Sequence, residues 1–456
     1  MVGAATGGAA RVPVRGADSF LIALDAFMRR SGQGAQISQS VLELEGLPDM
    51  VALRGARGRL VEKHPLLFAR LRRSWRTWIP YWEVPSSVGK ALPLHAWSEL
   101  GTTGRLGDEV KPVADISQWL QSLTGRELSD GCNAALDVLE LRSGSCLVAL
   151  SWMHLLIDGK GAELLLAEIA DLCAGIESPA DPPEPAVAST PIADLVARSK
   201  PAIHRLTNLK TMRFASLGGP KPRHGRLRHE VLTLDATDSA FLRQRVDELS
   251  GGLFPMTFYV AVAARAHDAV LRHRNTAVDG FLASVPVQTR KRGARGPLFH
   301  NHVHVLFFAA HREALRSLES ACAAMKQQFG EMTRAGLHES FAALLELMMR
   351  LPAWLFMRVV RFQFRGEISS FFHSHTGAFA PELQQFAGAR ITNAYHLPCL
   401  GSPPGTGLFF NESGDRVNVV FAWREGALKP DELALTIAQT REDLLGKPLP
   451  AEAHAL

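Results

Sequence analysis

The chain has 456 residues, too many for one compact core of ordinary size, so its length predicts two domains. Its hydrophobic fraction of 46% and charged fraction of 21% exclude an intrinsically disordered protein. The net charge of +5 is spread along the chain without a nucleic-acid-binding motif. We therefore expect no nucleic-acid partner, and instead an anionic small ligand or an acidic partner domain.

The five cysteines are odd in number and widely spaced, and they form no CxxC pair, which favours reduced thiols over disulfides or zinc ligands. The N-terminal stretch has no apolar signal-peptide core, and no uncharged apolar run reaches the length of about 18 residues that spans a membrane. These patterns indicate a cytoplasmic protein. The nearest membrane candidate, 341–364, is interrupted by charges and by Pro352 and predicts two amphipathic helices facing the core. Contact with a membrane or a lipid substrate is the alternative.

Hydrophobic periodicity predicts several elements in the first half of the chain. One helix should end near His64, because Pro65 disfavours helical geometry in the residue before it. Residues 133–142 and 145–154 should form a hairpin, and its second strand is apolar almost throughout, which is typical of a sheet covered on both faces. The other elements expected here are helices over 18–30, 48–64 and 162–172, and strands over 36–46 and 78–85.

A change in composition divides the chain. Residues 175–191 are rich in proline, alanine, serine and acidic residues and show no hydrophobic period. We therefore expect an N-terminal lobe over 1–180, a Pro-rich linker over 181–195 and a C-terminal lobe over 196–456. The C-terminal lobe opens with a helical, basic region, and Asp235 or Thr237 is positioned to cap a later helix. Its further predicted elements are strands over 228–235, 281–290, 302–310, 388–398, 405–414 and 416–426, and helices over 236–250, 257–274 and 429–446.

The segment SWMHLLIDGKG joins the end of the buried strand to the next helix through a sharp corner. A neutral imidazole such as His154, held rigidly at a strand end, can accept a proton from an alcohol or amine that attacks a carbonyl. From the residues alone, a core histidine is an equally good interpretation. Asp158 is expected to point back into the protein and to need a cation, while Gly159 and Gly161 suit unusual dihedral angles or a close backbone approach.

The segment SWMHLLIDGKGAELLLAEIADL resembles the HHxxxDG region of the chloramphenicol acetyltransferase-like superfamily. That group includes nonribosomal-peptide condensation domains, wax ester synthase/diacylglycerol acyltransferases, polyketide-associated acyltransferases and plant acyl-CoA-dependent acyltransferases. Three further segments agree in the same order, LRGARGRLVEKHPLLFARL, FLASVPVQTRKRGARGPLFHNHVHVLFF and ARITNAYHLP. The resemblance implies an α/β fold with two chloramphenicol acetyltransferase-like lobes, each a mixed sheet with packed helices, and an active-site channel between them.

The resemblance also implies roles for individual residues. His154 matches the catalytic second histidine, and Met153 replaces the first, a departure that argues against an orthodox peptide-condensation domain. Asp158 and the neighbouring Gly159 match the structural support of the site, and Arg290 matches the arginine that commonly pairs with the aspartate. The plant branch carries a DFGWG motif that is missing here, which argues against that branch.

Candidate substrate-binding residues follow the arginine in the chain. Lys291, Arg292 and Arg295 could meet the phosphates of coenzyme A or the acidic face of an acyl carrier protein, and a solvated loop is the alternative interpretation. Asn301 and Asn393 are candidate donors to the thioester arm or to the acceptor.

Several other functions are excluded or disfavoured. His300, His302, His304, His373 and His375 could in principle form a metal site, but no carboxylate or cysteine accompanies them at ligand spacing. We expect no metal, and expect these histidines to line the substrate cavity or to make structural hydrogen bonds. No GxSxG, phosphate-binding loop or dinucleotide fingerprint is present.

The sequence therefore predicts a monomeric acyltransferase without a cofactor, which moves an acyl group from a thioester, with acyl-CoA favoured, to a hydroxyl acceptor. His154 acts as the general base. Carrier-protein-dependent condensation, forming an amide or an ester in natural-product biosynthesis, is the alternative within this chemistry. A non-catalytic binding module on the same scaffold is the competing class. Peripheral association with a membrane is the alternative to a purely cytoplasmic protein.

Overall fold

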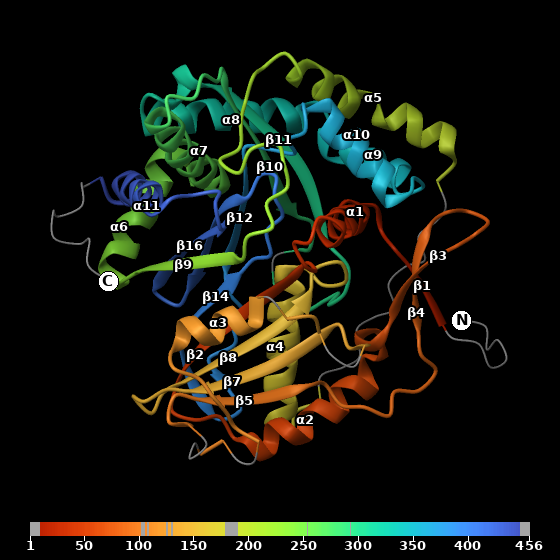
Figure 1. The fold of residues 1–456 in the computed structure, drawn as a ribbon, viewed down its shortest axis with the longest axis vertical. Helices are drawn as coiled ribbons and strands as arrows, with labels where there is room; N and C mark the ends of the chain where they lie inside the picture. The colour runs from red at the N-terminus through yellow and green to blue at the C-terminus, as the bar shows by residue number, and fades with distance from the viewer. Residues whose placement is uncertain are drawn as a thin grey trace.

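The computed structural model describes residues 10–101, 105–106, 109–124, 126–128, 131–177, 190–252, 254–291 and 293–446. Within these ranges the chain forms two lobes, each built on one large sheet with helices packed against it (Figure 1). This α/β architecture is the one that the sequence predicted.

The N-terminal lobe contains a seven-stranded sheet. In spatial order its strands are β13 (Gln385–Phe386), β14 (Ala389–Leu397), β2 (Ile37–Glu45), β8 (Cys146–Met153), β7 (Ala134–Glu140), β5 (Leu94–Ser98) and β6 (Lys111–Pro112). The predicted hairpin of β7 and β8 is confirmed, and β8 is buried along almost its whole length. It is covered because the helices α2 (Met50–Lys63) and α4 (Gly159–Cys173) pack on one face of the sheet and α3 (Ile116–Thr124) packs on the other.

The C-terminal lobe contains a six-stranded sheet. Its strands in spatial order are β11 (Val303–His311), β10 (Gly280–Gln288), β12 (Phe371–Ala378), β15 (Thr406–Ser413), β16 (Arg416–Arg424) and β9 (Leu227–Leu234). Its helices are α5 (Ile192–Leu209), α6 (Ala236–Ser250), α7 (Pro255–His273), α8 (Leu318–Arg334), α9 (Leu337–Met348), α10 (Ala353–Gln363) and α11 (Pro430–Leu445).

The remaining elements lie around the N-terminus of the chain and in short connections. A three-stranded sheet consists of β1 (Ala10–Pro13), β4 (Pro80–Val84) and β3 (Arg70–Arg73). Helix α1 (Gly16–Arg30) follows β1 and contacts α9 and α10, so it joins the two lobes (Figure 1). The 3₁₀ turns are η1 (Pro65–Phe68) and η4 (Arg312–Leu315).

Local sequence signals placed several boundaries correctly. Helix α2 ends at Lys63, with His64 as its C-cap before Pro65. Asp235, rather than Thr237, caps α6, because its carboxylate accepts from the N–H of Asp238 at 2.8 Å. The apolar segment 341–364 divides into α9 and α10, as predicted from its internal proline.

Two expectations about organisation need correction. Strands β13 and β14 belong to the C-terminal half of the chain, yet β14 pairs with β2 and completes the N-terminal sheet. A division of the chain at the linker therefore does not separate the sheets. The predicted linker 181–195 lies mostly outside the described residues, and its last four positions, 192–195, are already the first turn of α5. Strand β12, between β10 and β15, was not predicted.

The five cysteines agree with the expectation of reduced thiols. Cys132, Cys146, Cys173, Cys322 and Cys399 are all free thiols. Among the described residues, none of the helices combines the length and the apolar character that crossing a bilayer would need.

Candidate active site

His154 is the first residue after β8 and begins the turn that leads into α4. Its main-chain N–H donates to the carbonyl of Gln36 at 3.0 Å, and its own carbonyl accepts from Asn301 Nδ2 at 3.0 Å. Its ring meets the ring of Trp152 edge-on, with centroids 5.0 Å apart. The main chain of His154 is therefore held from both lobes, and its ring packs against Trp152.

One hydrogen bond determines which nitrogen of the His154 ring is basic. Nδ1 lies 3.2 Å from the carbonyl oxygen of Ile157, and because a carbonyl only accepts, Nδ1 carries the hydrogen. The lone pair is then on Nε2, for which no described residue provides a hydrogen bond. Burial lowers the pKa of His154, an effect that outweighs the nearby carboxylate of Asp158. The ring is consequently neutral near pH 7 and able to accept a proton.

Asp158 is occupied by groups other than the His154 ring. One carboxylate oxygen caps α4 by accepting from the N–H of Gly161 at 2.8 Å. The other accepts from Arg290 Nη1 at 2.7 Å and from the N–H of His302 at 2.9 Å. Asp158 thus links the start of α4 to the C-terminal lobe, which is the supporting position that the resemblance implied.

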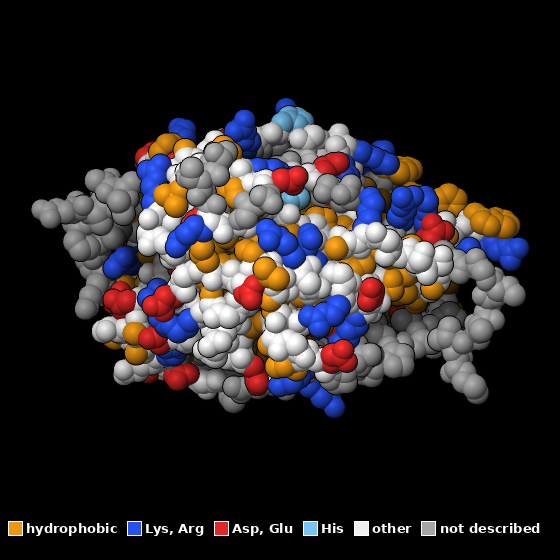
Figure 2. All heavy atoms as spheres, turned by 90° about the horizontal axis from the view of Figure 1, so that it is seen from below, with side chains coloured by type: hydrophobic (Ala, Val, Ile, Leu, Met, Phe, Trp, Pro, Cys, Tyr) orange, Lys and Arg blue, Asp and Glu red, His pale blue; other side chains and the backbone are white. Residues whose placement is uncertain are grey.

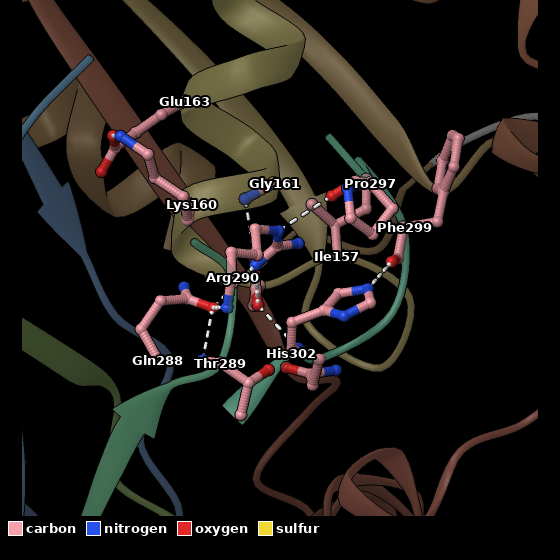
Figure 3. A network of polar contacts seen from close by, with 12 residues as sticks. Ile157, Lys160, Gly161, Glu163, Gln288, Thr289, Arg290, Pro297, Phe299 and His302 are labelled. Carbon is pink, nitrogen blue, oxygen red and sulfur yellow. Dashed lines mark hydrogen bonds and ion pairs between the residues drawn. The ribbon is translucent and has the colours of Figure 1, made fainter. Parts of the chain in front are cut away.

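Arg290, just after β10, reaches across the lobe boundary to make this ion pair (Figure 3). Only 3% of its side chain and 5% of that of Asp158 are exposed. Its Nε also donates to the carbonyl of Pro297 at 2.9 Å, and Nη1 lies 3.3 Å from Gln288 Oε1. The arginine therefore fixes both the aspartate and the loop that returns toward β11.

Asn301 is buried, and both hydrogens of its side-chain amide are used within the protein. Besides the bond to His154, Nδ2 donates to Asp18 Oδ1 at 2.8 Å, and the Asn301 N–H donates to the same oxygen at 2.8 Å. Asn301 therefore positions the main chain of His154. Its expected role as a donor to substrate does not fit this geometry.

Asp18 of α1 was not predicted as part of the site. Its second oxygen accepts from His300 Nδ1 at 2.9 Å and from the N–H of Arg15 at 3.1 Å, and the residue is completely buried. The sequence did carry a signal. Asp18 and Asp25 are seven residues apart, on one face of an otherwise apolar helix, and both are buried.

The close backbone approach predicted at the corner occurs at Gly161 and not at Gly159. A Cβ atom on Gly161 would lie 2.2 Å from the carbonyl oxygen of Leu298. A Cβ atom on Gly159 would make only ordinary contacts, the nearest at 3.7 Å, and its backbone lies outside the left-handed region. Gly161 is the position that lets the loop after Arg290 pack against α4.

Of the other predicted substrate-binding residues, some line the cavity and some do not. Lys291 and Arg295 line the cavity described below and are exposed. Arg292 lies outside the described residues. Asn393 does not line the cavity, because it is buried on β14, where Nδ2 lies 3.2 Å from Asn418 Oδ1 and its own oxygen accepts from the Asn418 amide at 2.9 Å. Asn393 therefore joins two strands and is not placed to meet substrate.

The histidine-rich segments contain structural bonds. His302 Nε2 donates to the carbonyl of Phe299 at 2.9 Å, and His373 Nδ1 donates to that of Leu408 at 3.0 Å. His375 lies against the ring of Tyr259, with centroids 4.3 Å apart. In the part of the chain that the structure describes, no group of three or more histidine, cysteine or acidic side chains is arranged to hold a metal ion.

A second charged cluster, which the sequence did not predict, lies beside the site. Glu163 of α4 is fully buried, and its oxygens contact Lys160 Nζ at 2.6 Å and His396 Nε2 at 3.1 Å. The other ring nitrogen of His396 lies 2.9 Å from Ser40 Oγ, which also accepts from Trp152 Nε1 at 3.1 Å. A continuous set of contacts thus runs from α4 to the tryptophan that supports His154.

These residues surround one large cavity between the lobes, with a volume of about 2220 Å³. This exceeds the roughly 300–1,000 Å³ of most small-molecule pockets, so it has room for two substrates. The walls come from α1 and α4 on one side and from β10, β12, α9 and α10 on the other. His154, Asp158, Arg290 and Glu163 all line it. The cavity lies between the lobes, where the resemblance implied a channel.

Comparison with known proteins reveals similarity of structure. No protein-family model matches the chain, and no curated protein matches it. The trichothecene 15-O-acetyltransferase of Fusarium sporotrichioides is similar, with a TM-score of 0.69, 12% identity and 98% coverage of both chains. The first condensation domain of the calcium-dependent antibiotic synthetase, in complex with a substrate analogue, has a TM-score of 0.64 and 16% identity over 96% of both chains.

A third similar structure is polyketide synthase associated protein 5 of Mycobacterium tuberculosis, with a TM-score of 0.60 and 14% identity over 96% of this chain and 98% of that one. All three similarities extend over nearly the full length of both chains. The protein therefore has the two-lobed fold of these condensation domains and of the acetyltransferase, which is the fold that the resemblance of its HxxxDG segment implied.

Proposed function

We propose that this protein is an acyltransferase that moves an acyl group from a thioester to an acceptor hydroxyl, with His154 as the general base. The observation that carries the proposal is the state of the His154 ring. Its Nδ1 hydrogen is bonded to Ile157, so its basic Nε2 is available in a cavity walled by both lobes. The structural neighbours, condensation domains and an acetyltransferase, support acyl transfer or condensation as the class of reaction.

In the proposed reaction, Nε2 of His154 removes the hydroxyl proton as the acceptor oxygen attacks the thioester carbonyl carbon. The tetrahedral intermediate then collapses, the carbon–sulfur bond breaks, and the same imidazole returns the proton to the departing thiolate. The products are an ester and a free thiol, and the histidine is regenerated. No cofactor is required, because the thioester itself carries the activated acyl group.

Acyl-CoA is the donor that we favour. Lys291 and Arg295 line the cavity from the loop after Arg290, where they could meet the phosphates of the coenzyme. The alternative donor is an acyl carrier protein, whose acidic surface would meet the same loop and whose reaction would form an amide or an ester. A direct comparison of binding to coenzyme A and to a carrier protein would separate these two donors.

The proposal is tested by following free-thiol release from acyl-CoA substrates with a panel of alcohol acceptors. His154→Ala should lower kcat/KM by about 10²–10⁴-fold, the usual contribution of a general base. His64→Ala is the matched control, because His64 lines the same cavity but its Nε2 already contacts Glu168 at 2.8 Å. Near-normal turnover by a folded His154→Ala variant would refute the assignment of the base. If the wild type released no thiol from any donor, carrier proteins included, the result would favour a binding module.

The pH dependence of turnover gives a second readout. The base must be neutral, and burial lowers the pKa of His154 from its ordinary 6.5. The value of kcat/KM should therefore rise with pH and level off below the pH at which a free imidazole would do so. If the rise of kcat/KM with pH had its midpoint above pH 6.5, the result would contradict a buried, uncharged environment for the general base.

A further inference from the structure

Helix α10 has one face packed in the protein and one face in solvent. Phe356 and Met357 are buried against α1. On the opposite face Trp354 is 51% exposed and Phe362 is 85% exposed. Two large aromatic side chains eight residues apart lie on the same side of a helix. Such exposed apolar faces on a folded protein mark sites of interaction.

The outer face of α10 is also basic. Residues 347–366 contain four arginines and no acidic residue. Arg358 lies between the two exposed aromatic residues on the helix surface, and Arg361 lies over the ring of Phe27 at 4.7 Å. A hollow of about 350 Å³ brings these side chains together, and it is lined in part by Arg30, Arg358, Arg361, Trp354 and Phe362.

Exposed apolar side chains of two neighbouring elements surround this helix. At the tip of the β3–β4 hairpin, Trp75 is 79% exposed, and Arg73 of the same hairpin donates to the carbonyl of Met349, just before α10, at 3.2 Å. Helix α5 packs against α9 and exposes further aliphatic residues. Figure 1 shows α5, α9, α10 and the hairpin on the same side of the molecule.

These elements hold most of the exposed large hydrophobic residues. Of the fourteen such residues in the described part of the chain, eight lie on them: Trp75, Trp78, Ile192, Val196, Ile203, Trp354, Val359 and Phe362. The face seen from below the N-terminal lobe, where α2 lies, shows hydrophobic, basic and acidic side chains interspersed (Figure 2).

The same helix forms a wall of the cavity between the lobes. Val359 is partly exposed to solvent and also lines the cavity, together with Phe356 and Val360. The nearby cavity residues from α9, including Leu344 and Met348, are also apolar. The apolar cavity lining of α9 and α10, here called the apolar arm, therefore lies on the helix that also carries the exposed aromatic and basic face.

We propose that α10, the tip of the β3–β4 hairpin and α5 form a surface that docks on an anionic phospholipid bilayer. Arginines attract the negatively charged headgroups, while exposed tryptophan and phenylalanine side chains insert at the membrane interface. Aromatic and arginine side chains also occur at protein interfaces, so binding to an acidic protein is the alternative that the experiment must separate from binding to a bilayer. The docking stands without the proposed function, but the delivery of a lipid substrate through the apolar arm rests on it.

The test measures cosedimentation of the full-length protein with vesicles. Vesicles of phosphatidylcholine mixed with phosphatidylglycerol should bind about tenfold more tightly than vesicles of phosphatidylcholine alone, and added salt should weaken the binding. Phe362→Ala and Arg358→Glu should each lower binding to the mixed vesicles severalfold. Thermal melting would establish that the variants are folded.

Two matched controls lie on α2, on the other side of the molecule. Val51→Ala removes an aliphatic side chain that is 77% exposed, and Arg54→Glu makes the same change of charge as the test variant. Neither should alter vesicle binding. The proposal is overturned if the wild type does not bind mixed vesicles, if control and test variants bind alike, or if the α10 variants affect only binding to an acidic carrier protein. Vesicle binding is measured without turnover. A loss of vesicle binding would therefore argue against the docking surface, whereas an absence of thiol release would argue against the proposed acyl transfer.

Discussion

The side-chain amide of Asn301 donates a hydrogen bond to the main-chain carbonyl of His154 at 3.0 Å. The same amide donates to Asp18 at 2.8 Å, so α1, the loop before β11 and the turn after β8 meet at one side chain. The main chain of the proposed base is thus fixed by Gln36, 118 positions before it in the sequence, and by Asn301, 147 positions after it.

Replacement of Asn301 by alanine should leave Asp18 with fewer donors in a fully buried site. A hydrogen bond to a charged group contributes about 1.5–3 kcal/mol, so we expect a loss of stability of that order, together with reduced kcat/KM in the folded protein. Asn393→Ala is the control, because Asn393 makes buried amide contacts but does not line the cavity. Denaturant titration and turnover of both variants would check this. Equal catalytic losses would contradict a positioning role for Asn301.

Breaking the ion pair between Asp158 and Arg290 from one side should be costly, because it leaves an uncompensated buried charge. We expect Arg290→Ala and Asp158→Asn each to lower the free energy of unfolding by about 3–5 kcal/mol. Asparagine retains an oxygen that can cap α4, so Asp158→Asn separates the effect of the lost charge from the effect of a lost cap. The double variant should lose less than the sum of the two. Strict additivity in denaturant unfolding would show that the pair is not coupled.

Gly161 and Gly159 offer a direct test of the close backbone approach. Gly161→Ala places a Cβ 2.2 Å from the carbonyl oxygen of Leu298, so the loop that carries the partners of Asp158 must shift. Overpacking of this kind costs about 1–3 kcal/mol. Gly159→Ala meets nothing closer than 3.7 Å and should change stability by less than about 0.5 kcal/mol. Thermal melts of the two variants should differ accordingly, and similar melts would be inconsistent with the contact.

Acid should destabilise the protein strongly. Burial lowers the pKa of His229, His267 and His375 to about 4 and that of His373 to about 3. The unfolded chain binds protons near pH 6.5, whereas the folded chain does not, so the stability is fully present above pH 6.5 and is lost as the pH falls toward 4. Each histidine contributes a slope of about 1.4 kcal/mol per pH unit within this window.

Denaturant unfolding across that pH range measures the acid effect. His375→Phe keeps a ring against Tyr259 and removes one titrating group, so its stability should depend less steeply on pH than that of the wild type. A wild-type stability that is constant between pH 6.5 and 4.5 would be incompatible with neutral, buried histidines at these positions.

The sequence by itself determined the elements whose signals are local. Hydrophobic periodicity predicted most helices and strands, Pro65 and Pro352 marked helix boundaries, and the HxxxDG segment placed His154 at the end of a buried strand. The pairing of Asp158 with Arg290 followed from the resemblance and is present in the structure. Such features could be predicted because their information lies within a few neighbouring residues or within one recognisable segment.

Only the tertiary structure decided which groups that are distant in the sequence contact these residues. Asp18, rather than substrate, takes the amide of Asn301, and β14 crosses to the N-terminal sheet and brings Asn393 to Asn418 instead of to the cavity. Gly161 is constrained by a carbonyl 137 positions away in the sequence, which no local pattern could reveal. The physical reason is that the partner of a buried polar group is chosen by packing across the whole chain, whereas periodicity records only whether a residue is buried.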